Sequence, residues 1–351
     1  MRSPARPMSL ANTARPSDQT HRQALLVLVV LLLLSAVLLL LALAVGSSGF
    51  RGIFKLQDDP IALRIVWDIR APRALGAWLA GALLGLAGAV AQGLFRNPLA
   101  DPYLLGSASG ASLGVALALA MMGGTPFAAQ WLVRFGLTGA AFVGALGAVL
   151  LTLMLARGVQ HTLRLLLAGV VVGVVFGAIV SLVLMLQPDL MLTMQSFLLG
   201  STSFVGWSAC GLMAMALLLC LSAAWLLSPL LDGLALGEAS AASLGLALAQ
   251  MRAALVAVLA LATATAVAQT GLIAFVGLAA PHLLRSMLKR SHRVFIALSG
   301  LTGAVLLLAA DTLSRSLIAP QELPVGVVTA VLGGAYLLWL MHRRAGQDGG
   351  L

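Results

Sequence analysis

The chain has 351 residues, of which 61% are hydrophobic and only 9% are charged. Soluble domains carry about 25% charged residues, so this composition excludes a soluble domain and indicates a polytopic membrane protein. The formal net charge is +10, but the basic residues are scattered through short polar segments and form no stripe. We therefore do not expect nucleic acid as a partner, and in a membrane protein such a charge reports orientation.

The N-terminal 22 residues are polar, and an apolar run follows them from residue 23 to 45. The apolar core of a signal peptide has about 7–15 residues, so this run is too long to be one. It fits a membrane-spanning helix, which needs about 20 residues. We expect a retained first helix behind a polar tail.

Ten apolar runs follow one another along the chain, near 24–45, 74–94, 103–122, 137–156, 163–187, 206–228, 253–269, 271–288, 295–311 and 325–341. An even number places both termini on one side of the membrane. With the termini in the cytoplasm, 14 of the 21 basic residues lie in cytoplasmic segments and 7 lie outside, which favours this orientation. The predicted fold is therefore all-α, with ten transmembrane helices in one domain, 23–344, between cytoplasmic tails 1–22 and 345–351.

Two broken stretches interrupt the pattern, at 95–110 and 271–282. They follow runs of opposite direction, as expected if runs two to five and runs seven to ten form an inverted repeat. In such repeats the broken helices commonly mark the transport route. The alternative interpretation is that the glycines and prolines there only shape packing.

The longest cytoplasmic segment, 228–252, is rich in small and apolar residues although it faces water. Exposed apolar surface of this kind usually indicates a partner, and two short helices in one loop suit a groove on another protein. The alternative is an interfacial helix that lies on the bilayer.

A series of motifs occurs in order along the chain, at 69–73, 85–88, 96–102, 165–169, 236–238, 275–278, 281–282 and 322–326, with Gln92, Arg285, Asp311 and Arg315 between them. Together they resemble the permeases of type II ABC importers for ferric siderophores, haem and vitamin B12, from about residue 25 to 344. The resemblance implies a multi-pass protein of the bacterial inner membrane and a homodimeric channel made with a second copy of the chain. It also implies two separate ATPase subunits and a periplasmic substrate-binding protein.

The sequence around the two lysines of the chain agrees with ATP hydrolysis on a separate subunit. A P-loop lysine follows a glycine, whereas Lys55 follows Phe54 and Lys289 follows Leu288. We therefore expect no ATP hydrolysis on this chain. We also expect it to have no catalytic residue, no metal site and no cofactor, and the resemblance implies that ATP and Mg are bound by the partner ATPase.

Three sets of site residues are expected, two from the resemblance and the third from the apolar loop. Docking of the binding protein is assigned to Arg70, Arg73 and Arg315, and a cytoplasmic gate to Asn97, Leu99, Thr162 and Leu163. Docking of the ATPase is assigned to Leu234, Leu236, Gly237, Glu238, Ala241 and Leu244 in the apolar loop. The local alternatives are that Asn97 caps freed backbone groups, and that the arginines pair with Asp68 and Asp311 or with lipid phosphates.

Two other classes of protein fit the sequence less well. An ion-coupled secondary transporter needs ionisable residues mid-membrane, whereas Asp189, Asp311 and Glu322 lie near the ends of runs. An intramembrane enzyme would use His282, which has no second histidine or carboxylate at a supporting spacing. Among cargoes, the basic outer mouth favours haem, which carries propionates, with a ferric siderophore next and cobalamin also open.

Overall fold

The computed structural model describes residues 16–45, 60–121, 130–156, 162–237, 241, 247–287 and 291–348, and these residues form helices and connecting turns without a strand. The helices are α1 (Pro16–Ala44), α2 (Pro60–Ile65), η2 (Val66–Arg70), α3 (Ala71–Leu94), η3 (Pro102–Leu105), α4 (Ser107–Met121), α5 (Gln130–Leu155), α6 (Thr162–Leu186), η4 (Pro188–Leu190), α7 (Met191–Leu199), α8 (Trp207–Ala235), α10 (Leu248–Thr270), α11 (Val276–Met287), α12 (His292–Ser316) and α13 (Val325–Asp348). The predicted all-α class is confirmed.

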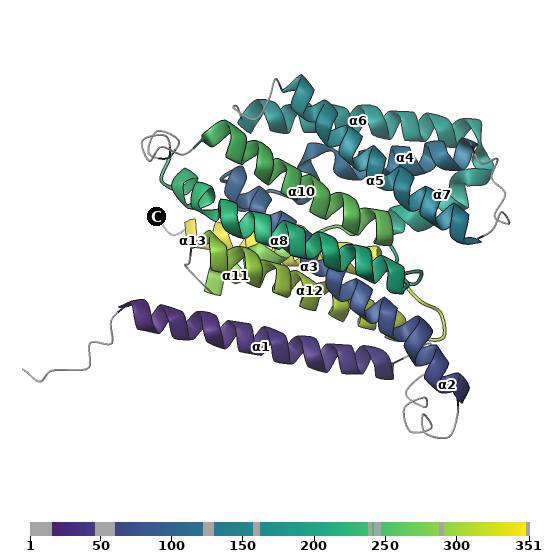
Figure 1. Cartoon of the computed structure of the whole chain (residues 1–351), viewed down its shortest axis with the longest axis horizontal. Helices are drawn as coiled ribbons and strands as arrows, with labels where there is room; N and C mark the ends of the chain where they lie inside the picture. Colours follow the sequence, from purple (N-terminus) through teal and green to yellow (C-terminus); the bar gives the residue numbers. More distant parts are fainter. Residues whose placement is uncertain are drawn as a thin grey trace, which may run out of the picture.

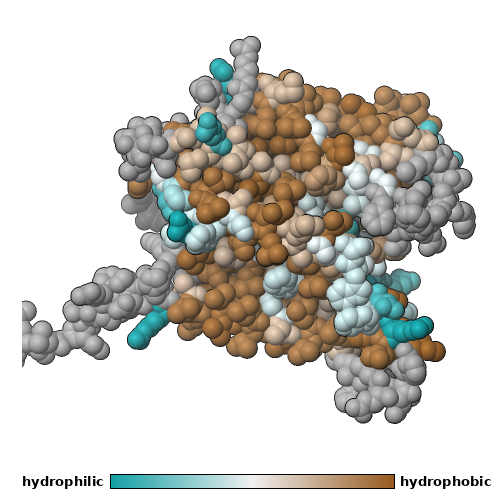
Figure 2. Space-filling model, viewed as in Figure 1, coloured by the Kyte–Doolittle hydropathy of each residue, from teal (hydrophilic) through white to brown (hydrophobic). Residues whose placement is uncertain are grey.

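Each of the ten predicted runs coincides with a helix. Seven helices within the described ranges are long and apolar enough to cross a membrane, and α4 and part of α13 are shorter apolar helices. These numbers are compatible with ten spans. Figure 2 shows apolar side chains covering the broad face of the bundle, as expected of a surface that meets lipid.

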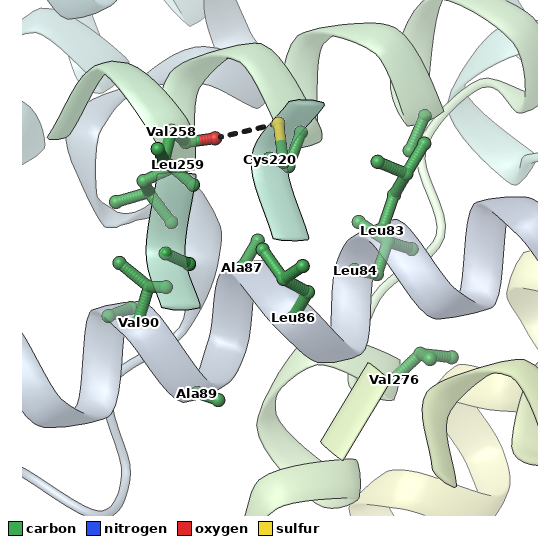
Figure 3. Close-up of a cluster of buried hydrophobic side chains, with 14 of the residues drawn as sticks. Leu83, Leu84, Leu86, Ala87, Ala89, Val90, Cys220, Val258, Leu259 and Val276 are labelled. Atoms are coloured by element: carbon green, nitrogen blue, oxygen red, sulfur yellow. Dashed lines mark hydrogen bonds between the residues drawn. The ribbon is translucent and has the colours of Figure 1, made fainter. Parts of the chain in front are cut away.

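The centre of the bundle is α3, which packs against α8, α10, α11 and α12 (Figure 1). In Figure 3, Leu86 of α3 lies between Cys220 of α8 and Val258 of α10 on one side and Val276 of α11 on the other. The Cys220 thiol lies 3.7 Å from the Val258 carbonyl oxygen, to which it donates. The side chain of Leu86 is fully buried.

Glycines bring the backbones of this core together. A Cβ atom on Gly81 would lie 2.3 Å from the carbonyl oxygen of Gly303 in α12, and one on Gly88 would lie 1.6 Å from that of Gly277 in α11. Lipid tails are as apolar as leucine, so close backbone packing of this kind is a main source of helix association in membranes. The glycine content of α3 therefore explains its central position.

The two broken stretches meet inside the bundle. The Tyr103 hydroxyl donates to the Ile273 carbonyl oxygen at 3.2 Å, and the Pro102 ring packs against Gly277. Each break contains a non-glycine residue with positive φ, Arg96 at +52° and Phe275 at +69°. The two breaks indicated by the sequence are thus in contact, and the inverted repeat itself stays a prediction.

Two predicted boundaries differ from the structure. The eighth apolar run was placed from residue 271 with its first part broken, and α11 begins at Val276, because Gly271 takes a φ of +69° and ends α10. The sixth run was expected to end at 228, but α8 continues through Pro229 to Ala235. The segment between α8 and α10 is thus shorter than the predicted loop 228–252.

Candidate transport and docking sites

A cluster of charged side chains lies where α3 begins and α12 ends, at the right in Figure 1. Arg73 Nε lies 3.2 Å from Asp311 Oδ1, and Arg73 Nη1 lies 2.7 Å from Glu322 Oε2. Arg315 Nη2 lies 3.0 Å from Asp311 Oδ2, and the Thr202 hydroxyl donates to Asp311 Oδ1. We call Arg73, Asp311, Arg315 and Glu322 the Arg73 cluster.

The members of the Arg73 cluster differ in exposure. The side chains of Asp311 and Arg315 are 0% and 2% exposed, that of Arg73 is 9% exposed, and that of Glu322 is 28% exposed. Buried charges are stable only when they are paired and hydrogen-bonded, and the contacts of Asp311 meet this condition. Glu322 is the member that reaches the surface.

The guanidinium groups of Arg70 and Arg315 also bind the end of α1. Arg70 Nη1 donates to the carbonyl oxygens of Leu43 and Ala44 at 3.0 and 3.3 Å. Arg315 Nη1 donates to those of Ala42 and Val45 at 3.2 and 3.1 Å. The last carbonyls of a helix lack partners within it, so the two arginines cap the C-terminus of α1.

The three arginines assigned to the binding protein are thus brought to one end of the bundle. The alternative considered from the sequence, pairing with Asp311, occurs for Arg73 and Arg315. Docking itself stays a prediction. The partnership of Arg73 with Glu322 escaped the sequence analysis, because the two residues are 249 positions apart.

The predicted gate lies after α3 and at the start of α6. Asn97 Oδ1 accepts a hydrogen bond from the Leu99 backbone N–H at 2.9 Å, so the local capping role considered for Asn97 is present. The side chains of Leu99 and Leu163 are 48% and 79% exposed. Thr162 is the first residue of α6. The gating role of these four residues stays a prediction.

The residues assigned to ATPase docking fall into two groups. Leu234 and Ala241 are fully buried and help to hold the segment on the bundle, whereas Leu236 is 73% exposed. Gly237 has a φ of +111° and no atom within 4 Å of a Cβ placed on it. Only glycine takes such a φ readily, so a side chain there would strain the turn. Glu238 and Leu244 lie outside the described residues.

A cavity of about 580 Å³ opens between α5, α7, α8 and α10. Among the described residues, its lining includes Thr138, Thr193, Ser208 and Gln269 and no ionisable side chain. Within the same part of the chain, no three or more histidine, cysteine, aspartate or glutamate residues are grouped so that they could hold a metal ion. The described lining therefore presents hydroxyl and amide groups.

Fold and surface together define a polytopic helical membrane protein, and known proteins resemble it in sequence and fold. The model of the FecCD transport family matches residues 27–343. The hemin transport system permease protein HmuU of Yersinia pestis is 38% identical over 318 residues, covering 88% of this chain and 94% of that protein. The vitamin B12 import system permease protein BtuC of Salmonella paratyphi A is 41% identical over 281 residues, covering 80% of this chain and 84% of that one.

A solved structure has the same fold. A metal-chelate type ABC transporter in an inward-facing conformation matches with a TM-score of 0.79 and 30% identity, covering 89% of this chain and 97% of that one. The chain belongs to the FecCD transport family. It is accordingly a transmembrane permease subunit of the importer class predicted from its motifs.

Proposed function

We propose that two copies of the chain form the channel of an ATP-driven importer of the bacterial inner membrane, and that its cargo is an iron chelate, with haem first. The observation that carries this assignment is similarity over nearly the whole chain to the hemin permease of Yersinia pestis. Similarity to the vitamin B12 permease keeps cobalamin as a second cargo. The basic outer mouth favours haem less than the sequence indicated, because Arg73 and Arg315 are paired with Asp311 and Glu322.

The cargo is tested in proteoliposomes that contain the permease with its ATPase and binding protein, with ATP and Mg on the ATPase side. We expect haem to accumulate in preference to a ferric siderophore and cobalamin. Accumulation of cobalamin alone would overturn the haem assignment. Uptake driven by an ion gradient without the ATPase would support a secondary transporter instead, which the pairing of Asp311 with two arginines disfavours.

The ATPase is proposed to bind the segment around Leu236 and Gly237. Its support is an exposed apolar side chain beside a turn that requires glycine. Gly237→Leu should reduce co-purification of the ATPase and ATP-driven transport, whereas Gly211→Leu, at an exposed position on α8 with no atom near its Cβ, should not. Unchanged ATPase binding by Gly237→Leu would refute this surface.

The binding protein is proposed to dock at the Arg73 cluster. A carboxylate of that protein can replace Glu322 at Arg73 Nη1, since Glu322 is the exposed member of the cluster. Arg73→Gln should weaken docking at low salt by about tenfold, and docking to the unchanged chain should weaken as salt rises. The control Arg22→Gln alters an exposed arginine at the other end of α1. Equal docking by both variants would mean that Arg73 is purely structural.

The gate is proposed to close between copies of the chain. Its support is the exposure of Leu99 and Leu163 in the single chain, which leaves both available to a second copy. Cysteines at either position should crosslink across the dimer, in a background without Cys210 and Cys220, and ATP should change the yield. A pair that crosslinks in no nucleotide state would refute the gate.

Both termini are proposed to be cytoplasmic, on the support of the basic residues counted along the sequence. A reporter enzyme fused after Leu351 tests this orientation, since alkaline phosphatase is active only outside the cytoplasm. Activity of such a fusion would reverse it.

A further inference from the structure

The C-terminal part of α8 is fastened to the first turn of α12. Asp232 Oδ1 lies 3.0 Å from the His292 backbone nitrogen and 2.7 Å from His292 Nδ1. One turn earlier, Arg293 Nε donates to the Ser228 hydroxyl at 3.3 Å, and its guanidinium carbon lies 4.6 Å from the centroid of the Trp225 ring. We call these five residues the α8–α12 junction.

Asp232 acts as the cap of a helix to which it does not belong. The first N–H groups of a helix have no partner within it, and Ser291, the N-cap residue of α12, makes no side-chain cap hydrogen bond. Asp232 fills this position from α8, where its negative charge also suits the helix N-terminus. Because a carboxylate only accepts hydrogen bonds, His292 Nδ1 carries the hydrogen.

Pro229 is a point at which α8 can bend, and it lies between the two contacts of the junction. It lies inside α8 and has no backbone N–H, so it removes a helical hydrogen bond and leaves a point at which the helix can bend. The contact of Ser228 with Arg293 precedes this point, and the contact of Asp232 with His292 follows it. The two contacts therefore hold both sides of the weak point against α12.

The end of α3 packs against the α8–α12 junction. A Cβ atom on Gly93 would lie 3.2 Å from Leu231 Cδ2 and 3.3 Å from His292 Cδ2. From there α3 and α12 run together, with backbone contact at Gly81 and Gly303, as far as the Arg73 cluster. Two tightly packed helices thus connect the end of α8 with the opposite end of the molecule.

We propose that Asp232 is a positioning residue that transmits movement of Leu236 and Gly237, which follow α8, to α12 and α3. This proposal rests on the proposed function, because these two residues carry the surface assigned to the ATPase. Asp232 lies about one turn before Leu236 and Gly237. A displacement of this surface during ATP hydrolysis passes through the two hydrogen bonds of Asp232 to α12. Without these bonds, the end of α8 would bend at Pro229 and absorb the displacement.

The test measures substrate transported per ATP hydrolysed in the full complex with ATPase and binding protein. Asp232→Ala should keep normal ATPase binding and lower this ratio by about threefold to tenfold. Asp232→Asn should restore most of it, because the amide oxygen still accepts the His292 N–H bonds. Asp189→Ala is the control, since Asp189 is exposed and makes no side-chain contact with the described residues.

The outcomes separate coupling from docking. An unchanged ratio for Asp232→Ala with the ATPase bound would overturn the coupling role and leave the docking surface standing. Loss of ATPase binding by Asp232→Ala would also overturn it, by making Asp232 a docking residue. If Asp232→Ala cannot be purified, His292→Ala carries the test by the same criterion. It keeps the backbone bond to Asp232 and removes the ring, with its bond to Asp232 and its packing at Gly93 and Phe295.

Discussion

Helices α1 and α3 are both apolar enough to span a membrane, but their surroundings are opposite. In the most apolar 18-residue stretch of each, 6% of the residues are buried in α1 and 89% in the helix that contains α3. The stretch in α1 is also the more apolar, with a mean hydropathy of 3.4 against 1.8. In lipid, the more hydrophobic helix is thus the one left outside, because small residues and not apolarity drive helices together.

The two helices also meet the bundle differently. Helix α3 touches its neighbours through glycine backbones, which leave no space for a side chain. Helix α1 stands at the edge of the bundle in Figure 1, where Leu28, Leu31 and Ala42 pack on the core. It also makes polar bonds, from Arg70 and Arg315 to its last carbonyls and from Trp78 Nε1 to the Ser35 hydroxyl at 3.1 Å. Substitutions in the two helices should therefore differ greatly in effect.

The largest effect is expected at Gly88 of α3. Gly88→Leu should prevent folding, because even its Cβ would meet the Gly277 carbonyl oxygen at 1.6 Å and the backbone would have to move. The yield of monodisperse protein in detergent measures this. Gly147→Leu on α5, where no atom lies within 4 Å of the added Cβ, should purify normally. Equal yields would show that glycine packing does not determine the position of α3.

The next effect is expected at the attachment of α1. Arg315→Met should lower the free energy of unfolding by about 3–5 kcal/mol, because it leaves the buried Asp311 with one arginine and removes a donor from the α1 carbonyls. Denaturant unfolding in detergent is the measurement. Arg22→Met, at an exposed position of α1, should change stability by less than about 0.5 kcal/mol. Similar values for the two variants would contradict the capping role.

A smaller effect is expected where α1 meets Trp78. Ser35→Ala removes a hydrogen bond from a site that is 5% exposed and should cost about 1 kcal/mol. Its matched control is Ser222→Ala on α8, whose exposed hydroxyl bonds only within its own helix and should cost less than about 0.5 kcal/mol. The same unfolding measurement applies. A Ser35→Ala variant as stable as the unchanged chain would exclude this bond as an attachment.

The smallest effect is expected on the outer face of α1. Leu33 is 62% exposed, so Leu33→Ala should alter the free energy of unfolding by less than about 0.5 kcal/mol. Leu83 of α3 is fully buried, and Leu83→Ala should cost about 2–5 kcal/mol. Comparable losses at both positions would mean that α1 is covered by another part of the assembly.

The helical class and the positions of the ten apolar runs followed from the sequence, since hydropathy is a property of neighbouring residues. The sequence also placed Gly271 at the start of a broken stretch and Gly237 in the apolar loop, and both take a positive φ, which glycine adopts more readily than other residues. The end of α8 was missed. Pro229 normally indicates a helix end, but α8 continues beyond it, where Leu230, Leu231 and Leu234 pack into the core and Asp232 binds His292.

Contacts between distant residues were decided by the packing of helices. The sequence singled out Arg70, Arg73 and Arg315 as a set, but not that two of them cap α1 or that Arg73 reaches Glu322. Hydropathy places α1 and α3 in the membrane alike and does not distinguish the helix that faces lipid from the helix at the centre. That difference depends on which faces match, since a glycine permits close approach only where another backbone lies opposite it.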